Sequence, residues 1–134
     1  MMTWQTYLGV MAGGAAGVGA RLFLSNYIAN QFGQSFPWGT LIVNVSGCFI
    51  IGLFSGITGP DGMFMTSPLV RQIITIGILG GFTTFSAFSL QTISLLADGE
   101  FFYGAFNIVA SLLFCLAGTW LGLAMAGLLQ PKYL

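Results

Sequence analysis

The stretch from Gln72 to Ala97 carries no charged residue, and its middle reads Gly80-Gly81-Phe82-Thr83-Thr84-Phe85-Ser86-Ala87-Phe88. A run of about 20 apolar residues is long enough to cross a bilayer. Two glycines and three hydroxyls inside such a run are typical of an irregular helix. Backbone groups without partners are costly in lipid, so irregular backbone survives only where protein buries it or it lines a cavity. This segment therefore predicts a broken helix that holds something small.

Composition extends this prediction to the whole chain. Of its 134 residues, 56% are hydrophobic and 4% are charged, whereas soluble domains carry roughly 25% charged residues. We predict an all-α membrane protein with a single integral membrane domain over residues 1–134. Four spans of the required length are expected at about 4–24, 38–57, 67–97 and 101–129. A polar link from Ser25 to Ser35, a turn at 58–62, the turn Asp98-Gly99-Glu100 and the end signal Pro131-Lys132 separate or close these spans.

The charges outside the spans bear on orientation. Four spans place both termini and the second loop on one side, which then holds Arg71 and Lys132, while Arg21 lies at the end of the first span on the other side. Membrane orientation follows the difference in Lys and Arg between sides. Two basic residues on one side against one on the other give only a weak orientation signal. Such a chain can insert in either orientation, which allows an antiparallel, dual-topology homodimer. The alternative is that one orientation is still selected from this small bias.

Small residues recur at helical spacing along three of the predicted spans. Glycines four residues apart let helix backbones approach closely, which drives helix association in lipid. We expect tight helix packing at Gly9, Gly13 and Gly17, at Gly52 and Gly56, and at Gly118 and Gly122.

Several function classes lose the residues that they need. The chain has no histidine, and its three acids, Asp61, Asp98 and Glu100, lie in predicted loops. Proton relays in membranes use acidic or histidine side chains within the spans. Cys48 and Cys115 lie in apolar runs with neither metal-site spacing nor a disulfide framework. We therefore expect no enzyme.

Polar residues inside the spans need partners. Asn44 lies near the middle of the second span, where its amide either bonds another helix or donates N–H groups to an anion. In the fourth span, residues at steps of four share one face. This polar stripe favours a wet path over simple helix association, and it consists of Tyr103, Asn107, Ser111, Cys115 and Thr119.

Phe85 and Phe88 share a face of the third span because they are three residues apart. Such a pair is usually core packing, but an aromatic ring has a positive edge that can meet an anion where water is excluded. Hydroxyls at Thr83, Thr84 and Ser86 would suit a small, hard anion. Conduction needs binding weak enough for the ion to leave.

The chain resembles the Fluc (CrcB-type) fluoride channels. Three stretches carry the resemblance: Gly13-Gly14-Ala15-Ala16-Gly17 with Arg21; the stretch from Gly39 to Phe49, which is similar to the family's GTLxVNxxGxF; and the stretch from Gly80 to Ser89, which is similar to its GGxTTFSTFS. Length, order and spacing agree over nearly the whole chain. The chain departs at Ala87, where threonine is usual, and at Gln91, where glutamate is common.

The resemblance implies a passive, fluoride-selective channel that lets cytoplasmic fluoride leave the cell. It implies an antiparallel homodimer with two pores, embedded as a multi-pass protein in the bacterial inner membrane. The expected partners are fluoride, the lipid bilayer and a second copy of the chain, with no nucleic acid.

The resemblance also assigns roles to residues. Fluoride would contact Asn44 and the ring edges of Phe85 and Phe88. The hydroxyls beside the rings and the polar stripe add Thr84, Ser86, Asn107 and Ser111 to the predicted pore, and Arg21 and Thr40 are expected in vestibule or structural positions. A structural sodium ion at the dimer centre would bind the carbonyl oxygens of Gly80 and Thr83 from both copies.

The main alternative is a small four-helix, dual-topology exporter of cationic toxicants. Such a transporter needs an acidic residue within a span to couple protons to cations, and this chain has its acids in predicted loops. A subunit that only packs against others is the third interpretation.

Overall fold

The computed structural model describes residues 3–59 and 62–129, and every regular element within these ranges is helical. In chain order the elements are α1 (Trp4–Phe32), α2 (Trp38–Ile57), α3 (Pro68–Gln72), the π-helix η1 (Ile73–Leu79), α4 (Gly80–Phe82), α5 (Phe85–Ala97) and α6 (Phe101–Leu129). Four helical spans are long and apolar enough to cross a membrane, with α3 to α5 together forming the third. The prediction of an all-α chain with four such spans is confirmed.

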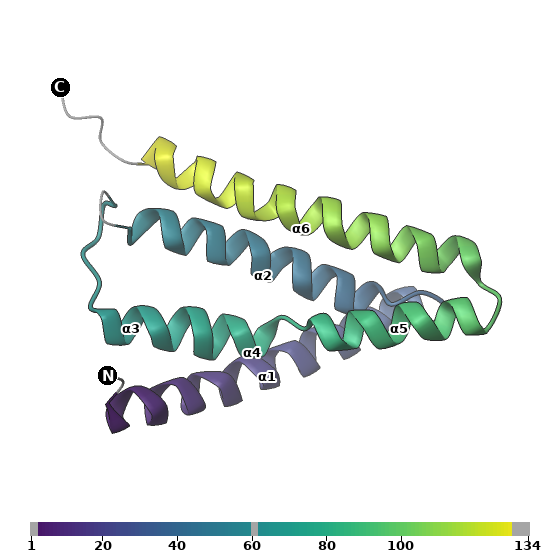
Figure 1. The fold of residues 1–134 in the computed structure, drawn as a ribbon, viewed down its shortest axis with the longest axis horizontal. Coiled ribbons are helices and arrows are strands. Elements are labelled where there is room, and N and C mark those ends of the chain that lie inside the picture. The colour runs from purple at the N-terminus through teal and green to yellow at the C-terminus, as the bar shows by residue number, and fades with distance from the viewer. Residues whose placement is uncertain (1–2, 60–61, 130–134) are drawn as a thin grey trace.

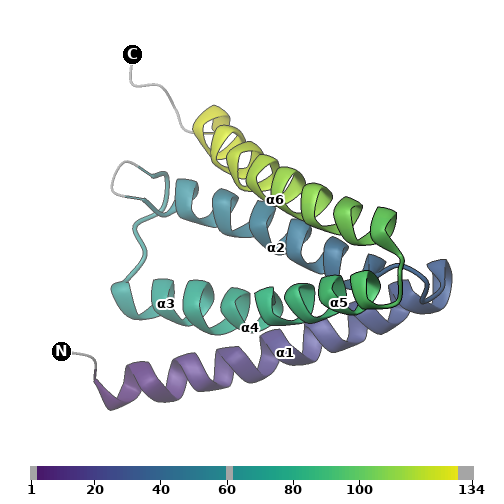
Figure 2. The same cartoon turned by 45° about the vertical axis from the view of Figure 1, so that its right-hand side comes forward.

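The spans run in alternating directions. α1 and the third span run one way, while α2 and α6 run the other, so that α1 begins and α6 ends at the same end of the bundle (Figures 1 and 2). α2 packs along α6, and α1 packs against η1 and α4. Contacts of α1 with α2 and of α5 with α6 join these two pairs.

The first helix is longer than predicted. The link expected from Ser25 to Ser35 is helical as far as Phe32, because neither Gly nor Pro interrupts the chain before Gly33. Gly33 ends the helix with a φ of 83°, and its N–H donates to the Ala29 carbonyl at 2.9 Å. The prediction that Arg21 lies at the end of the first helix is therefore wrong. At 1.5 Å per residue, Arg21 lies about 16 Å along the helix axis from the last helical residue, Phe32.

The other boundaries lie close to the predicted ones. α2 and α6 begin and end where the apolar runs do. The third span begins at Pro68, and the Ser67 hydroxyl before it accepts the Val70 N–H at 3.3 Å as an N-cap. Two of the predicted signals, Pro60-Asp61 in the turn and Pro131-Lys132 at the end, lie outside the described residues, and so does the charge of Lys132.

The prediction that the glycine ladders pack helices together is confirmed. A Cβ on Gly17 of α1 would collide with the carbonyl oxygen of Ile78 in η1. A Cβ on Gly122 of α6 would collide with the carbonyl oxygen of Phe49 in α2. Only glycine permits these two backbone approaches, which hold the α1–η1 and α2–α6 pairs together.

Large apolar side chains cover the outside of the single chain. Leu8, Phe23, Leu116 and Trp120 are each more than half exposed, whereas Val43 is fully buried. This distribution is the reverse of a soluble domain. It fits a chain whose surroundings are lipid or other apolar protein.

Candidate functional site

The third span changes conformation at Thr83 and Thr84. α4 ends at Phe82, both threonines are extended (φ −86°, ψ 157° and φ −152°, ψ 115°), and α5 begins at Phe85. The Thr84 hydroxyl accepts the Ala87 N–H at 3.2 Å and so caps α5. The β-branched side chain of threonine favours extended backbone, and threonine is also a preferred N-cap residue. Of the residues that predicted an irregular helix, the glycine pair Gly80-Gly81 is itself helical.

Asn44 of α2 supplies hydrogen bonds to this extended backbone. Its Nδ2 donates to the Thr84 carbonyl at 3.0 Å, and its Oδ1 accepts the Thr84 N–H at 2.8 Å. Asn44 is 7% exposed. An amide nitrogen carries two protons, and the bond to Thr84 uses one of them. The second remains available for a ligand at the same place.

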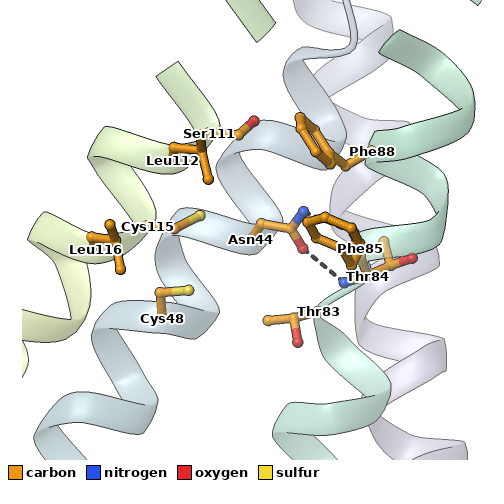
Figure 3. Close-up of a pocket in the computed structure, with 10 residues that line it drawn as sticks. All are labelled: Asn44, Cys48, Thr83, Thr84, Phe85, Phe88, Ser111, Leu112, Cys115 and Leu116. Atoms are coloured by element: carbon orange, nitrogen blue, oxygen red, sulfur yellow. Dashed lines mark hydrogen bonds between the residues drawn. The ribbon is translucent and has the colours of Figure 1, made fainter. Parts of the chain in front are cut away.

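Phe85 and Phe88 lie directly beyond this clamp. Their ring centroids are 5.2 Å apart with an interplanar angle of 50°. Both rings line an open cavity of about 250 Å³ between α2, α5 and α6, drawn in Figure 3. Its ten lining residues are Asn44, Cys48, Thr83, Thr84, Phe85, Phe88, Ser111, Leu112, Cys115 and Leu116. The structure thus brings together five residues predicted for the pore, from three separate spans.

A second cavity, of about 480 Å³, is also lined by Thr84. It brings together Arg21, Thr40 and Ser86, which were predicted as vestibule or pore residues. The Arg21 Nη1 donates to the Thr83 carbonyl at 3.5 Å, and the Thr84 and Ser86 hydroxyls lie 3.3 Å apart. Thr84 lines both cavities, so a space with a guanidinium and a space with aromatic rings adjoin the same extended residue.

Asn107 has a different position. Its Nδ2 donates to the Thr92 hydroxyl at 2.9 Å, and that hydroxyl donates to the Phe88 carbonyl at 2.7 Å. Asn107 is 2% exposed and is not among the residues that line the cavity at Asn44. It ties α6 to α5 behind Phe88, one turn from Ser111.

The polar stripe on α6 therefore divides along its length. Ser111 and Cys115 line the cavity with Asn44. Tyr103 packs against Phe36 instead, with ring centroids 5.9 Å apart, and Thr119 packs its backbone against Gly52. The common face of the stripe is real, but the elements that it faces change from one end to the other.

The carbonyls of Gly80 and Thr83 were predicted to bind sodium. In a continuous helix the Thr84 N–H would serve the Gly80 carbonyl, but it is donated to Asn44 Oδ1 instead. From the part of the chain that the structure describes, the Thr83 carbonyl accepts only the long bond from Arg21, at 3.5 Å. Neutral carbonyl oxygens are suitable ligands for a hard monovalent cation. One chain offers two of them, so this donor set fits sodium only if a second copy doubles it.

Cys48 was missed from the sequence as a cavity residue, although it follows Asn44 by four residues and so lies beside it at helical spacing. Cys115 was predicted as part of the polar stripe, and it lines the same cavity. Gln91 lines the second cavity, and within the described residues its Oε1 is the buried side-chain oxygen that has no hydrogen-bond partner. A buried amide oxygen is normally satisfied by protein or by ordered water, and this one belongs to a residue that lines a cavity.

Comparisons with known proteins agree with this geometry. Residues 8–123 match the family described as "CrcB-like protein, Camphor Resistance (CrcB)". The chain belongs to the CrcB-like family. The resemblance inferred from the three sequence stretches is thereby confirmed.

Curated relatives of this CrcB-like chain carry a more specific name. A protein of Rhodospirillum rubrum is 52% identical over 118 residues, which cover 88% of this chain and 92% of the relative. A protein of Opitutus terrae is 49% identical, covering 94% and 96%, and one of Methylocella silvestris is 47% identical, covering 90% and 92%. All three are named "Fluoride-specific ion channel FluC". These names describe ion channels and not enzymes.

Proposed function

We propose that this protein is a passive, fluoride-selective channel in the bacterial inner membrane that lets cytoplasmic fluoride leave down its electrochemical gradient. The observation that carries the proposal is the clamp of Asn44 on Thr84 beside the rings of Phe85 and Phe88 in one cavity. The names of three relatives that cover most of the chain support fluoride as the ion.

The chemistry of the cavity suits a small anion that must also leave. The uncommitted N–H of Asn44 and the ring edges of Phe85 and Phe88 present positive ends of dipoles without a full positive charge. Ser111 adds a hydroxyl donor from α6. Arg21 lines the second cavity, where it attracts anions without trapping them at the rings. Such distributed, weak contacts permit conduction.

The functional channel is an antiparallel homodimer with two pores. The single chain supports this because it covers the extended backbone only in part: Thr83 and Thr84 are half-buried, and the adjacent Phe85 is 74% exposed. At membrane depth such backbone is tolerated only against protein or a water-filled cavity. A second copy packed on the third span would cover it and would complete the outer wall of each pore.

Insertion in both orientations can be tested with charges placed in the loops. Gln34→Lys with Ser35→Lys adds two positive charges at one end of the bundle, and Met63→Lys with Met65→Lys adds two at the other. We expect each variant alone to insert one way and to conduct no fluoride, and the two co-expressed to restore flux. Neutral Gln34→Asn with Ser35→Gln is the control. Full flux from either lysine variant alone would contradict the antiparallel dimer.

A structural sodium ion completes the proposed dimer. The carbonyls of Gly80 and Thr83 from both copies would hold it, and its charge would satisfy backbone oxygens that the change in conformation leaves without helical partners. We expect sodium to raise the unfolding midpoint of the dimer above its value in N-methylglucamine, with no effect of a sodium gradient on flux. Equal midpoints in the two cations would contradict this ion.

The cationic exporter is not favoured. Within the described residues, the acids Asp98 and Glu100 lie beyond the end of α5, outside the spans. No carboxylate of the described spans is therefore placed to exchange protons for a cation.

The decisive experiment is fluoride efflux from liposomes reconstituted with the purified full-length chain. A fluoride electrode should record rapid efflux that needs only a potassium ionophore to balance charge, and the same vesicles loaded with chloride should release far less. Chloride efflux as fast as fluoride efflux would refute selectivity. A strict requirement for a proton or sodium gradient would refute the channel.

A further inference from the structure

Two thiols meet in the cavity at Asn44. Cys48 comes from α2 and Cys115 from α6, and both are half-buried. Both residues line this one cavity, together with Asn44 and Ser111. Figure 3 draws both sulfurs on the cavity side of their helices. The two cysteines are far apart in the sequence, so only the packing of α2 on α6 creates this pair.

The surroundings of the pair define what it can bind. Within the described residues no group of three or more His, Cys, Asp or Glu side chains gathers anywhere, so the pair has no third ligand of these types. The wall of the same cavity includes the apolar Leu112 and Leu116. Thiolate sulfur selects soft metal ions, whereas the oxygens of Ser111 and Asn44 are hard donors. Two sulfurs without further ligands suit an ion that accepts linear two-coordination.

Charge balance selects among such ions. When a divalent ion M²⁺ binds, each thiol releases its proton to water and each sulfur forms one bond to the metal, giving M(SR)₂ and two protons. The product is neutral. A monovalent ion on the same two thiolates would leave a net negative charge in an apolar wall, which is costly.

We propose that Cys48 and Cys115 form a two-coordinate binding site for a soft divalent metal ion of the mercury(II) type. The site bridges α2 and α6 and places the ion in the cavity that Asn44 lines. The step involves no oxidant or reductant, because the sulfurs keep their oxidation state. Binding depends only on the thiol pair and does not require that the protein conducts fluoride.

The binding test uses the purified full-length chain and mercuric chloride in the presence of a competing monothiol, 2-mercaptoethanol. Native mass spectrometry should show one mercury gained and two protons lost per chain, with the ultraviolet absorption of a sulfur–mercury–sulfur unit. Cys48→Ser and Cys115→Ser should each retain mercury roughly tenfold less against the competitor, because the second sulfur acts at high effective concentration. Leu116→Ile keeps both thiols and is the matched control.

Two results would overturn the site. One is two mercury ions per wild-type chain, which would mean that each thiol binds independently. The other is equal retention by the wild type and both single variants. Size-exclusion profiles establish that each variant is folded before it is compared.

A separate measurement separates this site from the proposed function. Mercury(II) should reduce fluoride efflux from wild-type vesicles, relative to untreated vesicles, more than from Cys48→Ser/Cys115→Ser vesicles. Bidentate binding without any loss of flux would leave the metal site intact and would contradict the cavity as the route of fluoride.

Discussion

Asn44 and Asn107 are two buried amides in neighbouring spans, each bonded to a threonine near α5, yet they meet different backbones. Asn44 bonds both the N–H and the carbonyl of Thr84, where the chain is extended. Asn107 bonds only the hydroxyl of Thr92, which lies within the regular helix α5. Asn44 is 7% exposed and Asn107 is 2% exposed, so burial alone does not distinguish the two residues.

The two amides differ in whether they take the place of helical hydrogen bonds. At Thr84 the amide supplies partners that a helix would have supplied, so the extended segment depends on Asn44. At Thr92 every backbone group already has a helical environment, and the amide adds one bond between helices. Burial of a polar residue in a membrane span therefore does not by itself mark a functional position. The state of the partner's backbone is the better guide.

The largest effect is expected from Asn44→Leu. Two backbone groups of Thr84 lose their partners, at about 1–3 kcal/mol each, so the free energy of unfolding should fall by about 2–6 kcal/mol and fluoride efflux should vanish. Thermal unfolding and vesicle efflux measure the two effects. Asn26→Leu, at an exposed asparagine of α1, is the control. Equal unfolding midpoints for both variants would show that the clamp is dispensable.

The rings beside the clamp should come next. Phe85→Ile and Phe88→Ile keep most of the apolar volume but remove the positive ring edge. We expect each to lower fluoride efflux about tenfold, equivalent to about 1.4 kcal/mol, with little change in unfolding. Phe114→Ile, at a half-exposed ring outside the cavity, should conduct like the wild type. If the Phe85 and Phe88 variants also do so, the rings serve packing alone.

Asn107→Leu should cost much less than Asn44→Leu. Interhelical hydrogen bonds in membranes average about 0.6 kcal/mol, so we expect a loss of that order in the free energy of unfolding. Efflux should stay within a few-fold of the wild type. A loss of flux as complete as that of Asn44→Leu would place Asn107 in the pore, as the polar stripe in the sequence predicts, and would break the comparison.

The smallest effect tests the pair itself. In a double-mutant cycle of Asn107→Leu with Thr92→Val, the coupling free energy should be about 0.6 kcal/mol. The matching cycle of Asn44→Leu with Thr84→Val should show almost none in unfolding, because Asn44 bonds the Thr84 backbone and not its side chain. Similar coupling in both cycles would contradict the distinction.

The sequence predicted which individual residues belong to the candidate site more reliably than it predicted which of them lie together. Helical spacing placed Phe85 beside Phe88 because that relation is local. The stripe on α6 was predicted as one face, but its neighbours are distant in the sequence, so the separation of Ser111 from Asn107 and Tyr103 was out of reach. The pairing of Cys48 with Cys115 was missed for the same reason.

The sequence by itself determined the four apolar spans, the glycine positions where helices approach, and the family, because each depends on residues close together along the chain. The tertiary structure decided that the extended residues are Thr83 and Thr84 and that Asn44 bonds the backbone of Thr84. The physical reason is that backbone groups in an apolar environment must find partners. Where the local helix does not supply them, a side chain from another span does, and only packing brings it there.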